Sequence, residues 1–337
     1  MIARRSAQAA LMAALMAAAL VAGCGKPAPQ ASAGHPDVLN FTILSAEDQQ
    51  SMSSVWQPLL DDLQKETGLK VKPYFAANYT NLIEAMRFNQ AQVGWFSALP
   101  SLEAVNRAHA EVLGRIVSGD GTVTYQSILI VRKGSGITLD DVLKCGKRYD
   151  FGIGDAKSTS GTLAPNFYLF APHGIEPADC FKTVRSASHQ ANLNAVANGV
   201  LNVATNNTEG LLFAQRANPA IPAKVQVIWT SPPLPESAIV ARKDLDPQVK
   251  QKLLNFFVHY GTAPGPDGDR QRKVLKGLTY AGFKPADDSY LDPVRLMVAS
   301  DDLSRAQRSK DPAQIAVASK AMDDAKALIA TRPKPAT

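Results

Sequence analysis

The chain has 337 residues, of which 36 are Lys or Arg and 30 are Asp or Glu, so its formal net charge is +6 at pH 7. This excess is too small to indicate nucleic-acid binding, and no basic run interleaved with aromatic residues is present in the sequence. A chain of this length can form two lobes of roughly 100–150 residues each.

The N-terminus carries the pattern of an export signal. Arg4 and Arg5 precede an unbroken apolar run over residues 9–21. The run is too short to span a bilayer, and an apolar core behind a charged start is typical of a signal peptide. We therefore expect a signal peptide over residues 1–23 and a mature protein on the periplasmic face of a bacterial membrane.

A cysteine follows this apolar run closely. The residues Val-Ala-Gly-Cys at 21–24 resemble a bacterial lipobox, which implies cleavage before Cys24 and lipid attachment to that residue. The alternative is an ordinary signal peptide in which Cys24 is incidental. Acylated Cys24 would anchor the protein to the lipid bilayer, and residues 24–36, which are mostly small, polar or Pro, would form a tether.

The next region alternates between strand and helix patterns. Strands are predicted over 38–44, 69–75 and 92–96, and helices over 55–67, 78–88 and 100–108. Gly68 ends the first helix, and Pro58 fits that helix only in its first turn. The alternation predicts an α/β lobe with a mainly parallel sheet.

Two β-branched runs, 125–133 and 237–243, bracket a second strand–helix region and predict two crossings between two lobes. The residues beyond them, 302–330, contain no Gly and predict a terminal helix or helix pair, which could mediate a homodimer. The expected division is a first lobe over 37–128 plus 236–300, a second lobe over 129–235, and a helical tail over 301–337.

Two cysteines remain after Cys24. Cys145 and Cys180 each come shortly before a predicted strand, and an even pair in an oxidising compartment favours a disulfide. If those strands are neighbouring and parallel, the two sulfur atoms meet at one end of the second lobe. We therefore predict a Cys145–Cys180 disulfide.

Three strand-to-helix junctions in residues 151–209 end in small polar residues. They are Ser-Thr-Ser-Gly at 158–161, Ser-Ala-Ser-His-Gln-Ala-Asn at 186–192, and Thr-Asn-Asn-Thr-Glu at 205–209. Ligands bind at the carboxyl ends of strands in open α/β sheets, and helix N-termini there favour anions. The stretch therefore predicts a pocket for a small oxyanion.

Each candidate residue also has a structural interpretation. Ser158, Thr159 and Ser160 can cap a helix, and His189 can be a solvent-facing residue of a helix start. In the functional interpretation, the hydroxyl groups of Ser158, Thr159 and Ser160 converge on an anion, and a neutral His189 donates a hydrogen bond to the same anion. Glu209 fits either a capping box or a carboxylate that receives a ligand's ammonium group.

An enzyme is the competing class of function. Ser158, His189 and Glu209 could form a hydrolase triad, but the Gly-x-Ser-x-Gly nucleophile motif is missing from the sequence. No His, Asp or Glu cluster has the spacing of metal ligands, so neither a metal nor a cofactor is expected.

The junctions, together with Asn-Tyr at 78–79, Arg-Phe at 87–88 and Tyr-Gln-Ser at 125–127, resemble the phosphonate-binding lipoproteins of ABC importers. The resemblance covers about 37–296. It implies a type II periplasmic-binding-protein fold of two lobes with mixed sheets, no enzymatic activity, and an ABC permease as partner. A phosphite- or phosphate-binding protein, or a ligand sensor of the same fold, is the alternative.

The same resemblance implies roles for individual residues. Ser158, Thr159, Ser160 and His189 would surround the phosphonate oxygens, and Glu209 would face a ligand amine. Tyr79 and Tyr125 would reach the oxygens from the first lobe or from the crossing, where they could otherwise be core residues.

One position departs from the family pattern. Binders of aminophosphonates place a second carboxylate in the return crossing, where the aligned residue here is Ser237. Glu236 is adjacent, so a shift of one residue would supply the carboxylate. Without it, a smaller ligand such as phosphite or methylphosphonate is expected.

Overall fold

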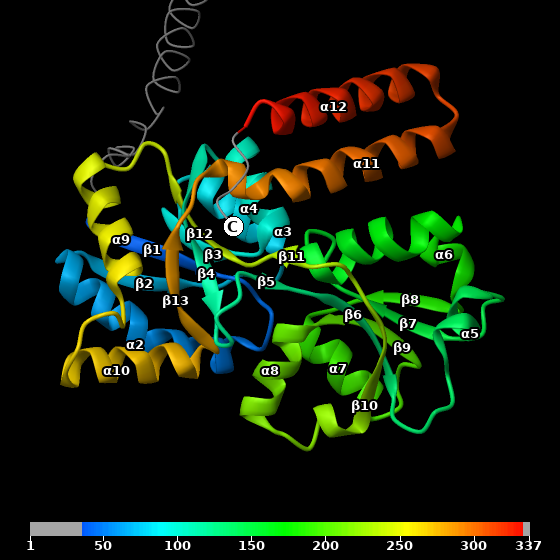
Figure 1. Cartoon of the computed structure of the whole chain (residues 1–337), viewed down its shortest axis with the longest axis horizontal. Coiled ribbons are helices and arrows are strands. Elements are labelled where there is room, and N and C mark those ends of the chain that lie inside the picture. The colour runs from blue at the N-terminus through cyan, green and yellow to red at the C-terminus, as the bar shows by residue number, and fades with distance from the viewer. Residues whose placement is uncertain (1–35, 333–337) are drawn as a thin grey trace, which may run out of the picture.

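The computed structural model describes residues 36–332. The predicted signal peptide, Cys24 and nearly all of the tether lie outside the described residues. Two sheets flanked by helices form two lobes, and the chain passes between them twice (Figure 1). The expected α/β fold of two lobes is confirmed. Within residues 36–332, no helix combines the length and apolar character needed to cross a bilayer.

A six-stranded mixed sheet forms the first lobe. Its strands are β1 (Val38–Ile43), β2 (Lys70–Tyr74), β3 (Val93–Phe96), β4 (Ala110–Ser118), β12 (Ala238–Arg242) and β13 (Tyr280–Pro285), in the order β13-β4-β12-β3-β1-β2. β1 is parallel to β2 and β3, as predicted, whereas β12 is antiparallel to β3 and β4. β4 was not predicted from the sequence, and it pairs only with strands that follow the second lobe.

The helices of this lobe are α2 (Gln49–Thr67), α3 (Tyr79–Arg87), α4 (Ala98–Arg107), α9 (Pro247–His259) and α10 (Pro266–Gly277). Asp48 caps α2 by accepting from the backbone N of Ser51 at 2.9 Å, so Pro58 lies in mid-helix and its predicted first-turn position is wrong. The helix tolerates it because Pro58 and Ser54, whose carbonyl loses its helical partner, are both solvent-exposed.

A five-stranded mixed sheet forms the second lobe. Its strands are β6 (Ser127–Arg132), β7 (Asp150–Ile153), β8 (Thr183–Ser186), β9 (Val203–Asn207) and β10 (Val225–Thr230), in the order β10-β6-β9-β7-β8. Its helices are α5 (Leu139–Leu143), α6 (Pro177–Cys180), α7 (His189–Ala197) and α8 (Thr208–Ala217), with a wider turn η1 (Thr159–Leu163) that continues into η2 (Asn166–Phe170). Because β7 is parallel to both β8 and β9, the three predicted junctions share one edge of this sheet.

A disulfide joins Cys145 and Cys180 in the structure, and their Cα atoms are 4.5 Å apart. The two cysteines precede β7 and β8, which are adjacent and parallel. The arrangement is the one that the sequence analysis expected. It closes the end of the second lobe where β7 and β8 begin.

The hinge consists of β5 (Thr124–Tyr125) and β11 (Leu234–Pro235), which pair antiparallel where the two crossings meet. Beyond the lobes, α11 (Asp292–Ser309) and α12 (Pro312–Ala330) form an antiparallel hairpin (Figure 1). The predicted helix pair is therefore present. The boundary expected at residue 301 falls inside α11, which begins earlier because Pro293 occupies its first turn.

Candidate ligand site

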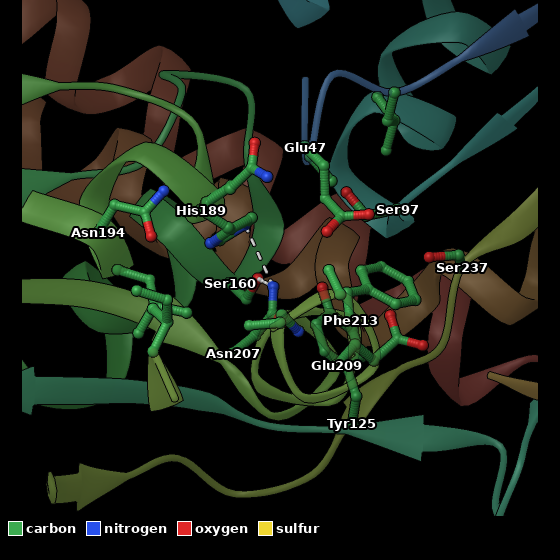
Figure 2. Close-up of a pocket in the computed structure, with 18 of the residues that line it drawn as sticks. Glu47, Ser97, Tyr125, Ser160, His189, Asn194, Asn207, Glu209, Phe213 and Ser237 are labelled. Atoms are coloured by element: carbon green, nitrogen blue, oxygen red, sulfur yellow. Dashed lines mark hydrogen bonds between the residues drawn. The ribbon is translucent and has the colours of Figure 1, made fainter. Parts of the chain in front are cut away.

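A cavity of about 440 Å³ lies between the lobes. Six of the predicted site residues line it: Tyr79, Tyr125, Ser160, His189, Glu209 and Ser237. Figure 2 shows His189, Ser160 and Asn207 grouped together, with Glu209 and Ser237 farther across the view. The other three candidates, Ser158, Thr159 and Glu236, are buried but are not part of the cavity wall.

Ser158 caps the turn η1. Its Oγ accepts from the backbone N of Gly161 at 2.9 Å and lies 3.4 Å from Nε2 of His189. Gly161 is needed because the chain passes close to Gly154 here, and a Cβ on Gly161 would come within 2.8 Å of the Gly154 Cα. The capping interpretation therefore holds for Ser158, which holds the turn η1 in place and does not line the cavity.

Thr159 connects the two lobes. Its Oγ1 accepts from the backbone N of Leu99 at 2.8 Å and donates to Oγ of Ser97 at 3.2 Å, both at the start of α4. Of the three consecutive hydroxyl residues, only Ser160 is part of the cavity wall. The three adjacent hydroxyl groups thus have three different surroundings, and the expected convergence of all three on one anion is not what the structure shows.

Asn207 determines which nitrogen of His189 carries the proton. Oδ1 of Asn207 caps α8 by accepting from the backbone N of Gly210 at 2.6 Å, so the Nδ2 group points elsewhere. Nδ2 donates to Oγ of Ser160 at 2.9 Å and lies 3.1 Å from Nε2 of His189. Because an amide NH₂ group can only donate, Nε2 of His189 accepts and the proton is on Nδ1.

Burial also keeps His189 uncharged. Desolvation lowers the pKa of His189 to about 4, so the imidazole is neutral near pH 7. Among residues 36–332, its buried Nδ1 has no hydrogen-bond partner. His189 is therefore a neutral donor whose N–H is unsatisfied within the protein.

Glu209 and Glu236 form a buried carboxyl pair. The two carboxyl groups interact with each other, and Glu236 accepts from the backbone N of Ser237 at 2.6 Å and from Oγ of Ser118 at 3.1 Å. The capping-box interpretation of Glu209 is wrong, because Asn207 caps α8 and the third helical position is a glycine.

The environment of the carboxyl pair favours protonation. Burial, followed by the charge of Glu236, raises the pKa of Glu209 well above its ordinary value, and burial raises the pKa of Glu236. The described cavity wall contains no Lys or Arg. This end of the site thus lacks a cation of its own.

The two tyrosines meet the cavity from the first lobe and the hinge. Tyr79 begins α3, and its backbone N donates to Oδ2 of Asp155 in the second lobe at 3.1 Å. Burial raises the pKa of both phenols, so each keeps its proton. The buried hydroxyl of Tyr125 has no hydrogen-bond partner among the described residues.

Several residues of the wall had no role in the sequence analysis, and Glu47, Ser97 and Asn207 are among them. Asn207 lies at the end of β9, in one of the three junctions that predicted the oxyanion pocket, so its position in the sequence could have identified it as a site residue. Glu47 and Ser97 follow β1 and β3 at the corresponding edge of the first lobe's sheet. Residues at the ends of strands in both lobes therefore contribute to the wall, together with residues of α7 and α8.

The arrangement does not form a hydrolase triad. The carboxyl group of Glu209 interacts with Glu236, while Nε2 of His189 faces Asn207. No carboxylate among residues 36–332 contacts Nδ1 of His189, where a triad needs its orienting acid.

Comparisons with known proteins agree with this geometry. Residues 41–291 match the family model described as the periplasmic substrate-binding protein of phosphonate ABC transporters. The chain is 40% identical over 273 residues to the phosphonates-binding periplasmic protein of Escherichia coli (strain K12), covering 81% of this chain and 79% of that protein. These relatives are substrate-binding proteins and not enzymes.

Two solved structures share the fold. The binding-protein component of an ABC phosphonate transporter from Pseudomonas aeruginosa has a TM-score of 0.83 and 34% identity, over 88% of this chain and 99% of that one. A Prochlorococcus marinus protein in complex with methylphosphonate has a TM-score of 0.68 and 18% identity, over 78% and 97%. The chain therefore belongs to the family of periplasmic substrate-binding proteins of phosphonate ABC transporters.

Proposed function

We propose that the protein captures an aminoalkyl phosphonate, such as 2-aminoethylphosphonate, and delivers it to an ABC permease. The carboxyl pair of Glu209 and Glu236 carries this proposal. Glu209 lines the same cavity as the neutral donors Ser160 and His189, and Glu236 interacts with Glu209 from outside the wall. The cavity therefore has one end suited to a cation and one end suited to an anion. A zwitterion with an ammonium and a phosphonate group matches both ends.

The end of the cavity suited to the anion would bind it through uncharged hydrogen-bond donors. We assign the phosphonate oxygens to the Ser160 hydroxyl, the Nδ1–H of His189, the hydroxyls of Tyr79 and Tyr125, and the backbone N–H groups at the start of η1. Hydrogen bonds to an ionised acceptor are about twice as strong as neutral ones, and a closed cleft strengthens them further. Ser158 and Thr159 would act indirectly, by holding η1 and the lobes in position.

The second carboxylate decides between ligand classes. A site with Glu209 alone would suit phosphite or methylphosphonate, as the aligned Ser237 suggested. The interaction between Glu236 and Glu209 favours an amine-bearing ligand, because an ammonium group bound to Glu209 also offsets the charge of Glu236 outside the wall. It supplies the cation that the described wall lacks.

Capture requires the lobes to close around the ligand. We propose that they rotate about the β5–β11 pair, with a first lobe over 37–128 plus 236–300 and a second over 129–235. The hydrogen bonds from Leu99 and Tyr79 to the second lobe support this hinge, because they would break on opening.

Isothermal titration tests the ligand class. We expect 2-aminoethylphosphonate to bind more tightly than ethylphosphonate and methylphosphonate, and these more tightly than phosphite and phosphate. Tightest binding of phosphite or phosphate would establish the alternative ligand class. No binding of any of the five would refute the proposal.

We also propose that the protein is lipid-anchored through Cys24. The lipobox-like residues 21–24 support this, and acyl chains would hold the mature chain at a membrane surface. Mass spectrometry of the membrane fraction should find Cys24 as an acylated N-terminal residue, and Cys24→Ala should release the protein into the soluble fraction. A mature chain that begins at another residue, or that begins at an unmodified Cys24, would contradict the anchor.

A further inference from the structure

Two consecutive residues after β1 connect the first lobe to the two helices that flank the cavity. Oε2 of Glu47 accepts from Nη2 of Arg216 on α8 at 2.8 Å. The backbone N of Asp48 donates to Oε1 of Gln190 on α7 at 2.8 Å, and Nε2 of Gln190 donates to Oδ2 of Asp48 at 3.2 Å. The segment of Glu47 and Asp48 therefore spans the space between α7 and α8.

Arg216 makes the more buried of these connections. The Glu47 side chain is only 4% exposed and that of Arg216 is 24% exposed. Nη1 of Arg216 also donates to the backbone O of Gly277 at 2.7 Å, so one guanidinium group holds two separate segments of the first lobe. A second ion pair between the lobes, Lys157–Glu103, is more exposed, at 30% and 18%.

Glu47 lies in the wall of a cavity that takes an anion. A buried carboxylate there repels a phosphonate group unless a cation offsets its charge. Arg216 supplies that cation from outside the wall, because Glu47 lines the cavity and Arg216 does not. The Glu47–Arg216 bridge thus both joins the lobes and removes an unfavourable charge from the site.

We propose that Arg216 is a positioning residue for ligand capture, which bridges the lobes in the closed state and neutralises Glu47 beside the bound anion. The inference rests on the proposed function of anion capture between closing lobes. In an open state the two side chains separate into water, so the bridge stabilises the closed, ligand-bound state in particular. Its loss should appear mainly as faster ligand release, with little change in the association rate.

The test compares Arg216→Gln, Glu47→Gln and the double variant, with 2-aminoethylphosphonate and ethylphosphonate as probes. Arg216→Gln should raise the Kd for both probes about 100-fold or more, because it leaves a buried carboxylate unpaired beside the anion. Glu47→Gln should raise the Kd about tenfold, because only the connection between the lobes is lost. The double variant should resemble Glu47→Gln rather than the sum of the two.

A matched control separates this role from general stability. Lys250 and Glu111 form an ion pair of 2.7 Å within the first lobe, in which the cation is about as exposed as Arg216 and the carboxylate is more exposed than Glu47. Lys250→Gln should leave the Kd and the dissociation rate unchanged. The Tm of ligand-free Arg216→Gln should stay near that of the wild type, while the rise in Tm on adding ligand should shrink.

Two results would overturn the inference. One is a wild-type dissociation rate in Arg216→Gln, measured by stopped-flow competition. The other is a loss of ligand-free Tm in Arg216→Gln as large as the loss in the ligand-bound protein. If the wild type prefers phosphate or phosphite, the proposed ligand is wrong, but the same variants tested with that anion still decide the role of Arg216.

Discussion

Replacing Glu209 with Gln is expected to abolish the preference for 2-aminoethylphosphonate over ethylphosphonate. The amide keeps the shape of the side chain but loses the charge that pairs with the ligand's ammonium group. Loss of a hydrogen bond to a charged group should weaken binding of the amine by roughly 1–3 kcal/mol, or about 10- to 100-fold. Isothermal titration of both ligands against both proteins measures the change.

The comparison with ethylphosphonate isolates the amine. Affinity for ethylphosphonate should change little in Glu209→Gln, because this ligand makes contact only with the oxyanion end. Glu66→Gln, the same chemical change on the exposed surface of α2, should alter neither affinity. Equal affinity of the wild type for both ligands would refute the role of Glu209.

The preference for the amine should also increase with pH. Burial raises the pKa of both carboxyl groups, so in the ligand-free protein the pair retains a proton to a higher pH than an ordinary carboxyl group does. An ammonium group binds best when the pair is ionised, so binding releases that proton. When ligand binding releases one proton, the affinity for that ligand rises by up to about tenfold per pH unit while the pair titrates.

Titrations of both ligands across a pH series test this coupling. The ratio of their affinities should rise with pH as the carboxyl pair ionises and then level off. The ammonium group lowers the pKa of the neighbouring phosphonate group, so the ionisation of each free ligand is titrated separately and its effect is removed before the ratio is taken. Repeating one titration in buffers of different ionisation enthalpy should reveal the released proton. A pH-independent ratio, with no proton released, would contradict the coupling.

The same pKa shifts have a consequence for stability. The carboxyl groups ionise more easily in the unfolded chain, where their pKa is near the ordinary value of 4.5. Their contribution to stability is therefore complete below that value and is lost as the pH rises through the raised folded-state pKa. An aminoalkyl phosphonate should offset the loss, because it binds the ionised pair.

Local patterns in the sequence were sufficient to locate the site. Small polar residues after β7, β8 and β9 predicted a pocket at one sheet edge, and Ser160, His189 and Glu209 do line one cavity. The prediction succeeded because parallel strands bring their carboxyl ends together. The disulfide could be predicted for the same reason, since its cysteines precede two adjacent parallel strands.

The sequence could not show which neighbouring side chain faces the cavity. Ser158, Thr159 and Ser160 are chemically alike, and their different surroundings depend on the wide turn η1 and on the approach of α4. Glu236 and Ser237 differ by one position beside β12, and a shift of one residue reverses the face of an extended chain. Packing of the two lobes settles both points.

Long-range contacts were the other limit. β4 pairs with β12 and β13, which follow the whole second lobe, so no nearby segment identified it as a strand. Glu47 and Arg216 are 169 positions apart, and neither belongs to a junction with a recognisable pattern. Such partners become visible only when the chain is folded.

The position of β12 affects the order in which the protein can mature. This strand fills the gap between β3 and β4, yet it is made after every strand of the five-stranded sheet. A chain that emerges N-terminus first can complete the sheet over 127–230 from contiguous residues. Until β12 emerges, the edges of β3 and β4 that pair with it are left without a partner strand. Until residue 242 has been secreted, the nascent first lobe is the part that needs a chaperone's protection.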